Sequence, residues 1–547
     1  MSVVTPTILS SGQQMSAIFE LISIEIVKEV NRIPFAQLIL IDGDAAQQQF
    51  PISNSDFFEP GKEIEIKLRY EDHPENETTV FKGIVTKQSV EAGSQGSVLT
   101  VTLKDKALKL TLVRKNVIYR EKPDHKIIEE IVTNGGLTAG SLDNSKAEHL
   151  ELVQYDATDW DFVLSRAEMN GFLVNVNDGE FNLVTPNISE NAQFTFEYGI
   201  SDIYAFEIET DGGHQYPDVA TVSWDIKEQK LTKVATATSF STKQGNLDGA
   251  QIAKTMGTES PTFVHPVPID PKDLQAWSDG IMSHNRLAMI RGYVSGPGIE
   301  TIKPLDVIEI AGIGDRFNGK TLVTGIRHLV NEDGWETAVQ FGLSPERFTQ
   351  QSDISGPAAA GQLPPIYGLQ IGVVAPFEED PNNEFRIKVA LSGMDSETGS
   401  IWARLASPDA GKDRGILFRP EPGDEVVVGF FNNDPRQAVV LGGMFSETNN
   451  PPELFEAPSE DNLNKGIVTR SGIVIKFIDD EKASILIETP EANKFILNDD
   501  EQKIEIADQH GNTLTMSADG IEIISANNLI IEASGDVEIK GSSVDIK

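Results

Sequence analysis

Acidic side chains are the most abundant groups in this sequence that could do chemistry. Two runs, Asp479-Asp480-Glu481 and Asp499-Asp500-Glu501, contain the paired carboxylates that a glycoside hydrolase uses around a glycosidic bond. Both runs stand between strand-like segments, where Asp and Glu are common as solvent-exposed turn residues. We therefore predict that they are turns, and we assign no catalytic role to them.

The other candidate groups also lack the spacing that chemistry requires. No two of the eight histidines form an HExxH motif or a close ligand pair. Gly312, Gly314 and Gly319 join two strand-like runs without a following helix, which predicts a hairpin turn rather than a nucleotide loop. There is no GxSxG motif, no P-loop and no cysteine nucleophile. We expect no catalytic residue, cofactor or metal. The histidines are His73, His125, His149, His214, His265, His284, His328 and His510.

Composition limits the class of protein. A chain of 547 residues is expected to form three or four domains, at roughly 150 residues each. The formal net charge of -39 argues against a nucleic-acid partner, because such a partner requires a basic surface. The sequence has no charged leader with an apolar core and no apolar run near the roughly 18 residues of a membrane span. We expect synthesis in the bacterial cytoplasm without a signal peptide.

Residues 1–350 alternate between strand and helix patterns. Short runs of apolar and polar alternation dominate the first 120 residues. Apolar spacing then predicts a helix that begins after Pro123, with Asp124 as N-cap, and a second from Thr158 to Asn170. A third is predicted over 272–289, with strands before and after it. This region reads as an α+β block of two β-rich subdomains.

A small β domain follows. Residues 351–366 are small, polar and rich in Pro and Gly, which predicts a linker. Residues 367–446 contain five short strand-like runs, and five strands of that length favour an OB-fold barrel. A second linker is predicted over 447–464.

Residues 465–547 are a succession of short strands and turns. Each strand has one apolar face, and a lone chain has nothing to cover it. Three chains that wind into a triangular prism would bury these faces, so we predict an intertwined trimeric β-helix. Its predicted core residues are Ile504, Ile506, Leu514, Met516, Ile521, Ile523, Val537 and Ile539. The predicted fold class is therefore mainly β with some α.

Four segments together resemble the VgrG family, the spike proteins of type VI secretion and related phage-tail-like injection systems. They are NRIPFAQLILIDGD from Asn31 with FEPGKEIEIKLRY from Phe58 and FKGIVT from Phe81, TDWDFVLSRAEMNGFLV from Thr158, PLDVIEIAGIGDRFNGKTLVTGIRH from Pro304, and GILFRPEPGDEVVVGFFNNDPRQAVVLGGMF from Gly415. Compact length and an acidic C-terminal region favour the spikes of extracellular particles over the long type VI versions.

The resemblance implies a structural role. It implies a homotrimeric hub, collar and needle at the end of the inner tube, in contact with baseplate proteins, that crosses a target membrane transiently. It also implies effector cargo on a separate protein, and release or delivery outside the cell on firing. A PAAR-like tip protein would dock on the open end of the needle, near Val544, Ile546 and Lys547.

Two other classes of protein remain open from the sequence. A trimeric phage-tail fibre or adhesin also uses β-helical trimers, but it does not require the hub-like segments or the OB-like domain. A hydrolase-bearing tail spike would need a catalytic block next to the β-helix, where this chain has only a short linker.

Overall fold

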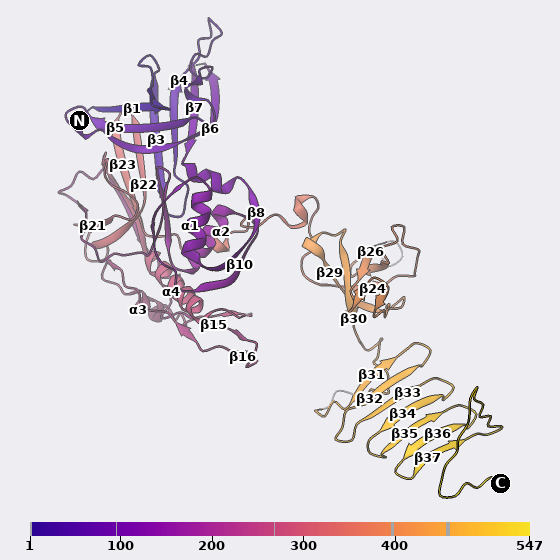
Figure 1. Cartoon of the computed structure of the whole chain (residues 1–547). Coiled ribbons are helices and arrows are strands. Elements are labelled where there is room, and N and C mark those ends of the chain that lie inside the picture. Colours follow the sequence, from indigo (N-terminus) through magenta and orange to yellow (C-terminus); the bar gives the residue numbers. More distant parts are fainter. Residues whose placement is uncertain (1–2, 95, 267, 395–398, 456–459) are drawn as a thin grey trace. The chain divides into compact units, whose positions relative to one another are not determined.

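The computed structural model describes residues 3–94, 96–266, 268–394, 399–455 and 460–547, and the chain divides into two compact units. The first unit is Met1–Pro357 and the second is Ala358–Lys547 (Figure 1). Both are built mainly from β-strands, which confirms the predicted fold class. No helix in the described ranges is both long and apolar enough to cross a membrane.

One large sheet organises the first unit. Its main path runs β14-β20-β23-β22-β3-β4-β7-β6-β5-β1-β2, with β13, β18 and β21 joined at the side. The strands are β1 (Val4–Ser10), β2 (Gln13–Gln14), β3 (Leu21–Glu29), β4 (Phe35–Ile41), β5 (Glu63–Tyr70), β6 (Thr78–Gly93), β7 (Gly96–Lys104), β13 (Phe194–Glu197), β14 (Ala205–Thr210), β18 (Lys243–Gln244), β20 (Ile290–Pro297), β21 (Val307–Ala311), β22 (Gly319–Asn331) and β23 (Gly334–Phe341).

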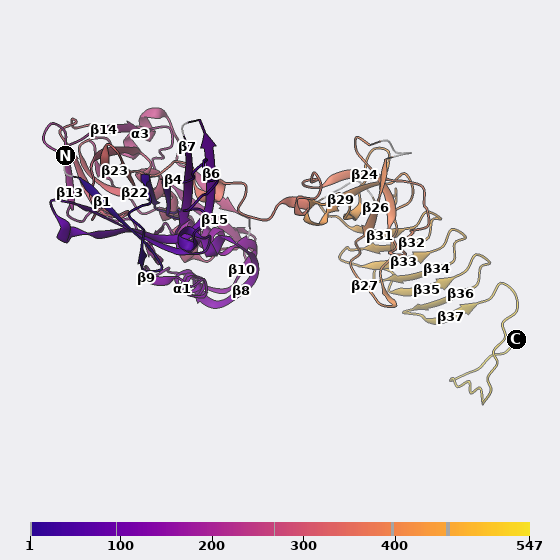
Figure 2. The same cartoon turned by 90° about the horizontal axis from the view of Figure 1, so that it is seen from above.

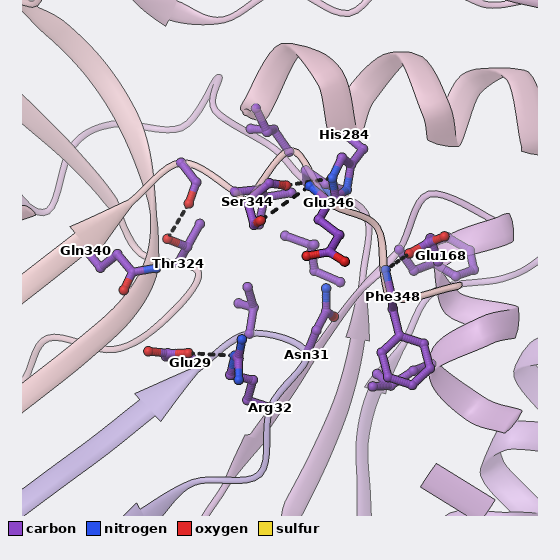
Figure 3. Close-up of a pocket in the computed structure, with 18 of the residues that line it drawn as sticks. Glu29, Asn31, Arg32, Glu168, His284, Thr324, Gln340, Ser344, Glu346 and Phe348 are labelled. Atoms are coloured by element: carbon purple, nitrogen blue, oxygen red, sulfur yellow. Dashed lines mark hydrogen bonds and ion pairs between the residues drawn. The ribbon is translucent and has the colours of Figure 1, made fainter. Parts of the chain in front are cut away.

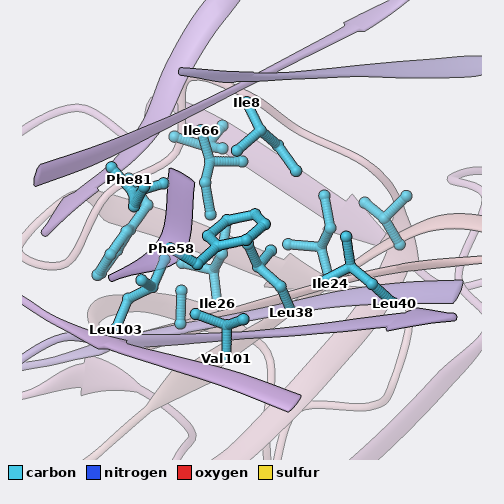
Figure 4. Close-up of a cluster of buried hydrophobic side chains, with 14 of the residues drawn as sticks. Ile8, Ile24, Ile26, Leu38, Leu40, Phe58, Ile66, Phe81, Val101 and Leu103 are labelled. Carbon is cyan, nitrogen blue, oxygen red and sulfur yellow. The ribbon is translucent and has the colours of Figure 1, made fainter. Parts of the chain in front are cut away.

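Strict alternation in the first strands creates the first core. Ile24 and Ile26 of β3 and Leu38 and Leu40 of β4 point to the same side and are completely buried. Figure 4 shows these side chains around Phe58, which stacks against the same cluster. Because the period of a strand is two, the intervening residues, such as Glu25 and Ile39, lie on the opposite, mixed face.

The same sheet continues into a second core. Val339 and Phe341 of β23 pack with Ile326 of β22 and Val294 of β20. Strand β22 pairs antiparallel with β3, so Arg327 lies opposite Val27 although some 300 residues separate them. This pairing joins the two halves of the first unit into one sheet, which local sequence patterns do not reveal.

Four α-helices and three smaller sheets complete the unit in its described ranges. The helices are α1 (Asp124–Asn134), α2 (Asp159–Met169), α3 (Gly249–Met256) and α4 (Pro271–Leu287). The sheets contain β8 (Arg114–Pro123) with β10 (Glu148–Thr158); β9 (Thr138–Leu142), β11 (Leu173–Asn177) and β12 (Glu180–Val184); and β15 (Ala220–Asp225), β16 (Lys230–Leu231), β17 (Ala235–Thr236) and β19 (Thr262–His265).

The three predicted helices are confirmed, with one correction and one omission. Thr158 caps α2, because its hydroxyl accepts the Asp161 N–H at 3.1 Å. Asp124 is not the N-cap of α1: Pro123 occupies that position, and Asp124 is a completely buried first-turn residue. Helix α3 escaped prediction because it has only eight residues.

Helices α2 and α4 approach closely where two glycines meet. A Cβ added to Gly280 would lie 2.9 Å from the backbone nitrogen of Gly171, and Gly171 itself has a φ of +72°. Glycine inside a helix normally costs stability relative to alanine, by about 1 kcal/mol. Its presence within α4 therefore indicates that backbone proximity requires it.

We expect Gly280→Ala to lower the unfolding temperature of the first unit, because the new methyl group must push α2 and α4 apart. Helix propensity alone predicts the opposite sign, whereas overpacking costs typically about 1–3 kcal/mol. Thermal unfolding measured by calorimetry checks the sign. An unchanged or raised unfolding temperature would show that the two helices have room to separate.

The chain remains attached to the first unit until Gly356. The Glu168 carboxylate accepts the Phe348 N–H at 2.5 Å, and the Arg114 guanidinium donates to the Ile354 carbonyl at 3.2 Å. Gly356 donates its N–H to the Asp156 carbonyl at 3.1 Å. The first residues of the predicted linker 351–366 thus contact the hub region, and the two compact units divide after Pro357.

The second unit begins with a closed five-stranded barrel. Its order is β24-β25-β26-β30-β29, from β24 (Gln370–Val374), β25 (Ile387–Leu391), β26 (Ser400–Leu405), β29 (Glu425–Phe430) and β30 (Ala438–Gly443). Val389, Val426, Val428 and Val440 fill its interior. The short strands β27 (Ala410–Gly411) and β28 (Arg414–Gly415) form a hairpin in the segment that connects β26 to β29. The five predicted strands and the OB-like barrel are confirmed.

Candidate functional site: an assembly surface

The last sheet of the second unit is a seven-stranded antiparallel meander. Figures 1 and 2 show its strands as successive rungs, each hydrogen-bonded to its sequence neighbours. They are β31 (Asn464–Val468), β32 (Val474–Ile478), β33 (Ser484–Glu488), β34 (Lys494–Asn498), β35 (Lys503–Ala507), β36 (Thr513–Ser517) and β37 (Gly520–Ile524). Pairing in this segment is within one chain, and the winding of three chains stays a prediction.

The register places the apolar residues of one face in two columns. Ile506 lies opposite Leu514, and Leu514 lies opposite Ile523. In the second column Ile504 pairs with Met516 and Met516 with Ile521. Six of the eight predicted core residues thus share one face, because β-strands present alternate residues on the same side.

Most of these side chains are exposed to solvent in the single chain. The exposed fraction is 39% for Ile504, 48% for Ile506, 70% for Ile521 and 58% for Ile523. A contiguous apolar surface of this kind on a soluble protein normally marks an interaction site.

Three aromatic and aliphatic residues of the same columns were not predicted. Phe495 of β34 lies between Ile487 and Ile506, and Leu497 lies between Ile485 and Ile504. Phe477 of β32 lies opposite Ile485 and so extends the second column by one more strand. The alternation was hidden in β34 because Ile496 between them is also apolar.

The opposite face of the sheet is mixed and carries ion pairs. Glu505 lies 3.0 Å from the Lys494 ammonium and 2.9 Å from the Lys503 ammonium. Hydrogen bonding to Lys503 lowers the pKa of the Glu505 carboxyl. The two faces therefore differ in kind: the columns of the first are apolar from β32 to β37, and only Lys465, opposite Phe477 at the β31 end, is charged.

Both acidic runs lie in exposed turns between these strands. Asp479-Asp480-Glu481 connects β32 to β33, and Asp499-Asp500-Glu501 connects β34 to β35. Lys465 pairs with Asp479 at 2.7 Å across the first hairpin. Their position agrees with the prediction of turn residues.

The chain beyond β37 has no assigned strand in residues 525–547. Val537 is 54% exposed and Ile539 is 66% exposed, so the two remaining predicted core residues are not part of the meander. Val544, Ile546 and Lys547, the predicted docking residues, are also exposed. One hydrogen bond ties the start of this segment to the sheet: Ala526 donates its N–H to Asn512 Oδ1 at 2.9 Å, just before β36.

A cavity of about 730 Å³ lies in the first unit between the end of β3, α2, α4 and the chain after β23. Figure 3 shows how two of its charged residues are satisfied: Glu29 pairs with Arg32 at 3.0 Å, and Glu168 accepts the Phe348 N–H. The His284 Nε2 bonds the Ser344 carbonyl at 2.8 Å, and burial lowers the pKa of this imidazole. The hydrogen bond from His284 attaches the segment after β23 to α4, which indicates a structural role for His284.

A second cluster brings together groups that are distant in sequence. Ligand atoms of Asp124, His149 and Asp273 lie within 4.8 Å of one another. The Arg166 guanidinium, however, bonds both Asp124 oxygens at 2.7 and 2.9 Å and reaches Asp273 at 4.0 Å. Because a fixed cation already occupies this place, the residues suit a salt-bridge network better than a metal.

The glycine-rich stretch is a hairpin, as predicted. Gly312 and Gly314 adopt φ values of +76° and +86° between β21 and β22, where Ile310 lies opposite Gly319. Positive φ at these positions explains the glycines without a nucleotide.

Comparison with known proteins gives three family matches. Residues 1–332 match the Alg8 N-terminal domain, 370–445 match the type VI secretion system/phage-baseplate injector OB domain, and 484–547 match the phage baseplate V C-terminal trimerisation domain. The type VI secretion system spike protein VgrG1a of Pseudomonas aeruginosa is 25% identical over 207 residues, which are 35% of this chain and 31% of that protein. Spike protein VgrG3 of Vibrio cholerae is 34% identical over 96 residues, 16% of this chain and 9% of that protein.

Among solved structures, an Escherichia coli component of the type VI secretion system is similar over 80% of this chain and 99% of its own, with 14% identity and a TM-score of 0.39. The class of protein is that of the VgrG-like spikes of contractile injection systems. The chain belongs to the family of the Alg8 N-terminal domain, whose model covers more than half of it. The matched stretches span at most about a third of the length of the curated relatives named here.

Proposed function

We propose that this chain is the homotrimeric central spike of a contractile injection machine. The observation that carries the proposal is the uncovered apolar face of the β31–β37 sheet. Two columns of Ile, Leu, Met and Phe side chains in water are unfavourable, at roughly 25 cal/mol per Å² of apolar surface. Three copies of the sheet around one axis would cover all three faces at once.

The segment after β37 supports pairing between copies. Residues 529–547 keep strand-like alternation, with exposed Val537, Ile539, Val544 and Ile546, yet form no strand within one chain. The family match of residues 484–547 to a trimerisation domain agrees with a partner of the same sequence. In the proposed trimer, these residues pair with neighbouring copies and complete the needle.

The other parts of the spike follow from this arrangement. The first unit would contact the inner tube and the baseplate, the barrel would form a collar, and the needle would puncture the target envelope. A PAAR-like protein would cap the open strand edges at Val544, Ile546 and Lys547, and effector cargo would be separate. We assign the chain a structural and not an enzymatic role, with assembly after synthesis in the cytoplasm.

Light scattering of the purified chain tests the proposal. We expect the full-length protein to have three times its monomer mass of 59.8 kDa, and a truncation that ends at Asn464 to lose most of this association. A monomeric full-length chain would reject the spike. If the truncated chain remained fully trimeric, the assembly surface would lie in the first unit or the barrel. The proposed role of the β31–β37 face would then be wrong.

A further inference from the structure

The buried cluster around His149 carries an inference that is independent of the assembly of three chains. Four elements contribute to it: Asp124 comes from α1, His149 from β10, Arg166 from α2 and Asp273 from α4. The side chains of Asp124, His149 and Asp273 are at most 10% exposed. Groups that are more than 100 residues apart in the sequence thus share one desolvated site.

Both ring nitrogens of His149 face a carboxylate. Nε2 lies 3.2 Å from Asp124 Oδ2, and Nδ1 lies 3.7 Å from Asp273 Oδ2. A neutral imidazole has one N–H and one lone pair, so it can donate to only one of the two. Arg166 Nη2 also lies 3.3 Å from Nε2, so a neutral ring with its proton on Nδ1 would share this donor with Asp124, which Arg166 Nη2 bonds at 2.9 Å. An imidazolium instead donates to both carboxylates and leaves Arg166 to Asp124.

Asp273 is the group left without a partner in this arrangement. Its Oδ1 atom is buried and makes no hydrogen bond, while Oδ2 has only the distant contacts to His149 and Arg166. Asp124, in contrast, accepts two bonds from Arg166 and one from Asn170 at 2.8 Å. An N–H on His149 Nδ1 points this donor at Asp273, and only the imidazolium supplies it while Nε2 still donates to Asp124.

Counting charges leads to the same result. With both carboxylates ionised and Arg166 protonated, a neutral His149 leaves the cluster with one net negative charge, and an imidazolium makes it neutral. Among the residues that the structure describes, the neighbouring groups supply no free cation in place of the imidazolium. Lys122 of β8 is paired with Glu130 at 2.5 Å, and Asp270, the N-cap of α4, adds further negative charge.

We propose that His149 is a proton-binding latch, whose imidazolium bridges Asp124 and Asp273 and so fastens α4 to α1 and α2. Helix α4 forms one wall of the first-unit cavity, and its His284 holds the chain at Ser344. Loss of the proton would therefore loosen α4 and the chain that leaves the first unit. The ligand of this site is a proton.

The sign of the pH dependence follows from the pKa directions. The Asp124 hydrogen bond raises the pKa of His149, and burial raises the pKa of Asp273. A group whose pKa is higher in the folded state adds stability at low pH, below its unfolded value of about 6.5 for His. That stability is lost as the pH rises through the folded pKa of His149.

Exchange of the imidazole Cε1 hydrogen, followed by mass spectrometry of the full chain across pH, measures the His149 titration directly. We expect a midpoint above 6.5 for His149 and a lower one after Asp273→Asn. His125 of α1 is the internal control, because burial lowers its pKa and it bonds Ser145 instead. A wild-type His149 midpoint at or below 6.5, or one that Asp273→Asn leaves unchanged, would overturn the latch.

Amide exchange provides a second test that does not depend on the variant folding. We expect the amide protection factors of α4, corrected for the intrinsic exchange rate, to be higher at pH 6 than at pH 8. A His149 pKa that is higher by one in the folded state corresponds to a difference of about tenfold. Helix α3, which contributes no group to the cluster, should show no such change. Equal protection of α4 at both pH values would contradict the proposal.

Discussion

Replacing Leu514 with Asp is expected to convert the full-length chain from a trimer to a monomer. Leu514 stands in the middle of an apolar column, between Ile506 and Ile523. In the proposed needle, three copies would bring three carboxylates close to one axis. Burial of an unpaired charge costs several kcal/mol even after relaxation, and far more before it.

Thr513→Asp is the matched control for this experiment. Thr513 is the neighbouring residue on β36, and its side chain is on the opposite, mixed face of the sheet. Light scattering should find this variant still trimeric and the Leu514→Asp variant at the mass of one chain. If Leu514→Asp remained a trimer, the apolar columns would not face the axis.

Replacing Arg166 with Leu is expected to lower the free energy of unfolding of the first unit by about 3–5 kcal/mol. Asp124 is completely buried, and its carboxylate depends on Arg166 for two hydrogen bonds. Burial alone would raise the pKa of Asp124, but hydrogen bonds from His149 and Arg166 hold it well below its usual range. Without Arg166, the buried Asp124 and Asp273 carboxylates would have only His149 as a cationic partner, so one of them must remain uncompensated or take up a proton.

Arg120→Leu is the control, because Arg120 and Glu151 form an exposed pair at 3.3 Å on the neighbouring ribbon. Surface pairs of this kind contribute about 0–1 kcal/mol. Denaturant unfolding of both variants at pH 7 gives the comparison. Equal losses would mean that water reaches Asp124 and that the cluster is not a buried network.

Several parts of this fold follow from local sequence. Helix α2 is predictable because Thr158, its apolar stripe and Gly171 all act within a few residues of one another. The barrel strands and the rungs of the last sheet are predictable for the same reason, since alternation with a period of two determines which side chains share a face. Six of the eight predicted core residues lie on one face of this sheet, and their burial in a trimer stays a prediction. Phe477, Phe495 and Leu497 of the same face were missed because their strands carry additional apolar residues.

Other features depend on which elements meet in space. Asp124 was predicted as a helix cap, because the sequence around it shows a suitable polar residue and nothing of Arg166 or His149. The histidines looked scattered, yet His149 lies between two carboxylates from distant helices.

The strand and helix periods, the turns and the apolar face of residues 464–524 can be predicted from the sequence, since each depends on neighbours a few residues away. The pairing of β22 with β3, the meeting of Gly171 and Gly280, and the buried site shared by Asp124, His149, Arg166 and Asp273 appear only in the folded chain. Such contacts depend on the order of strands in the sheet and on the closure of long loops, and these leave no periodic trace in the chain.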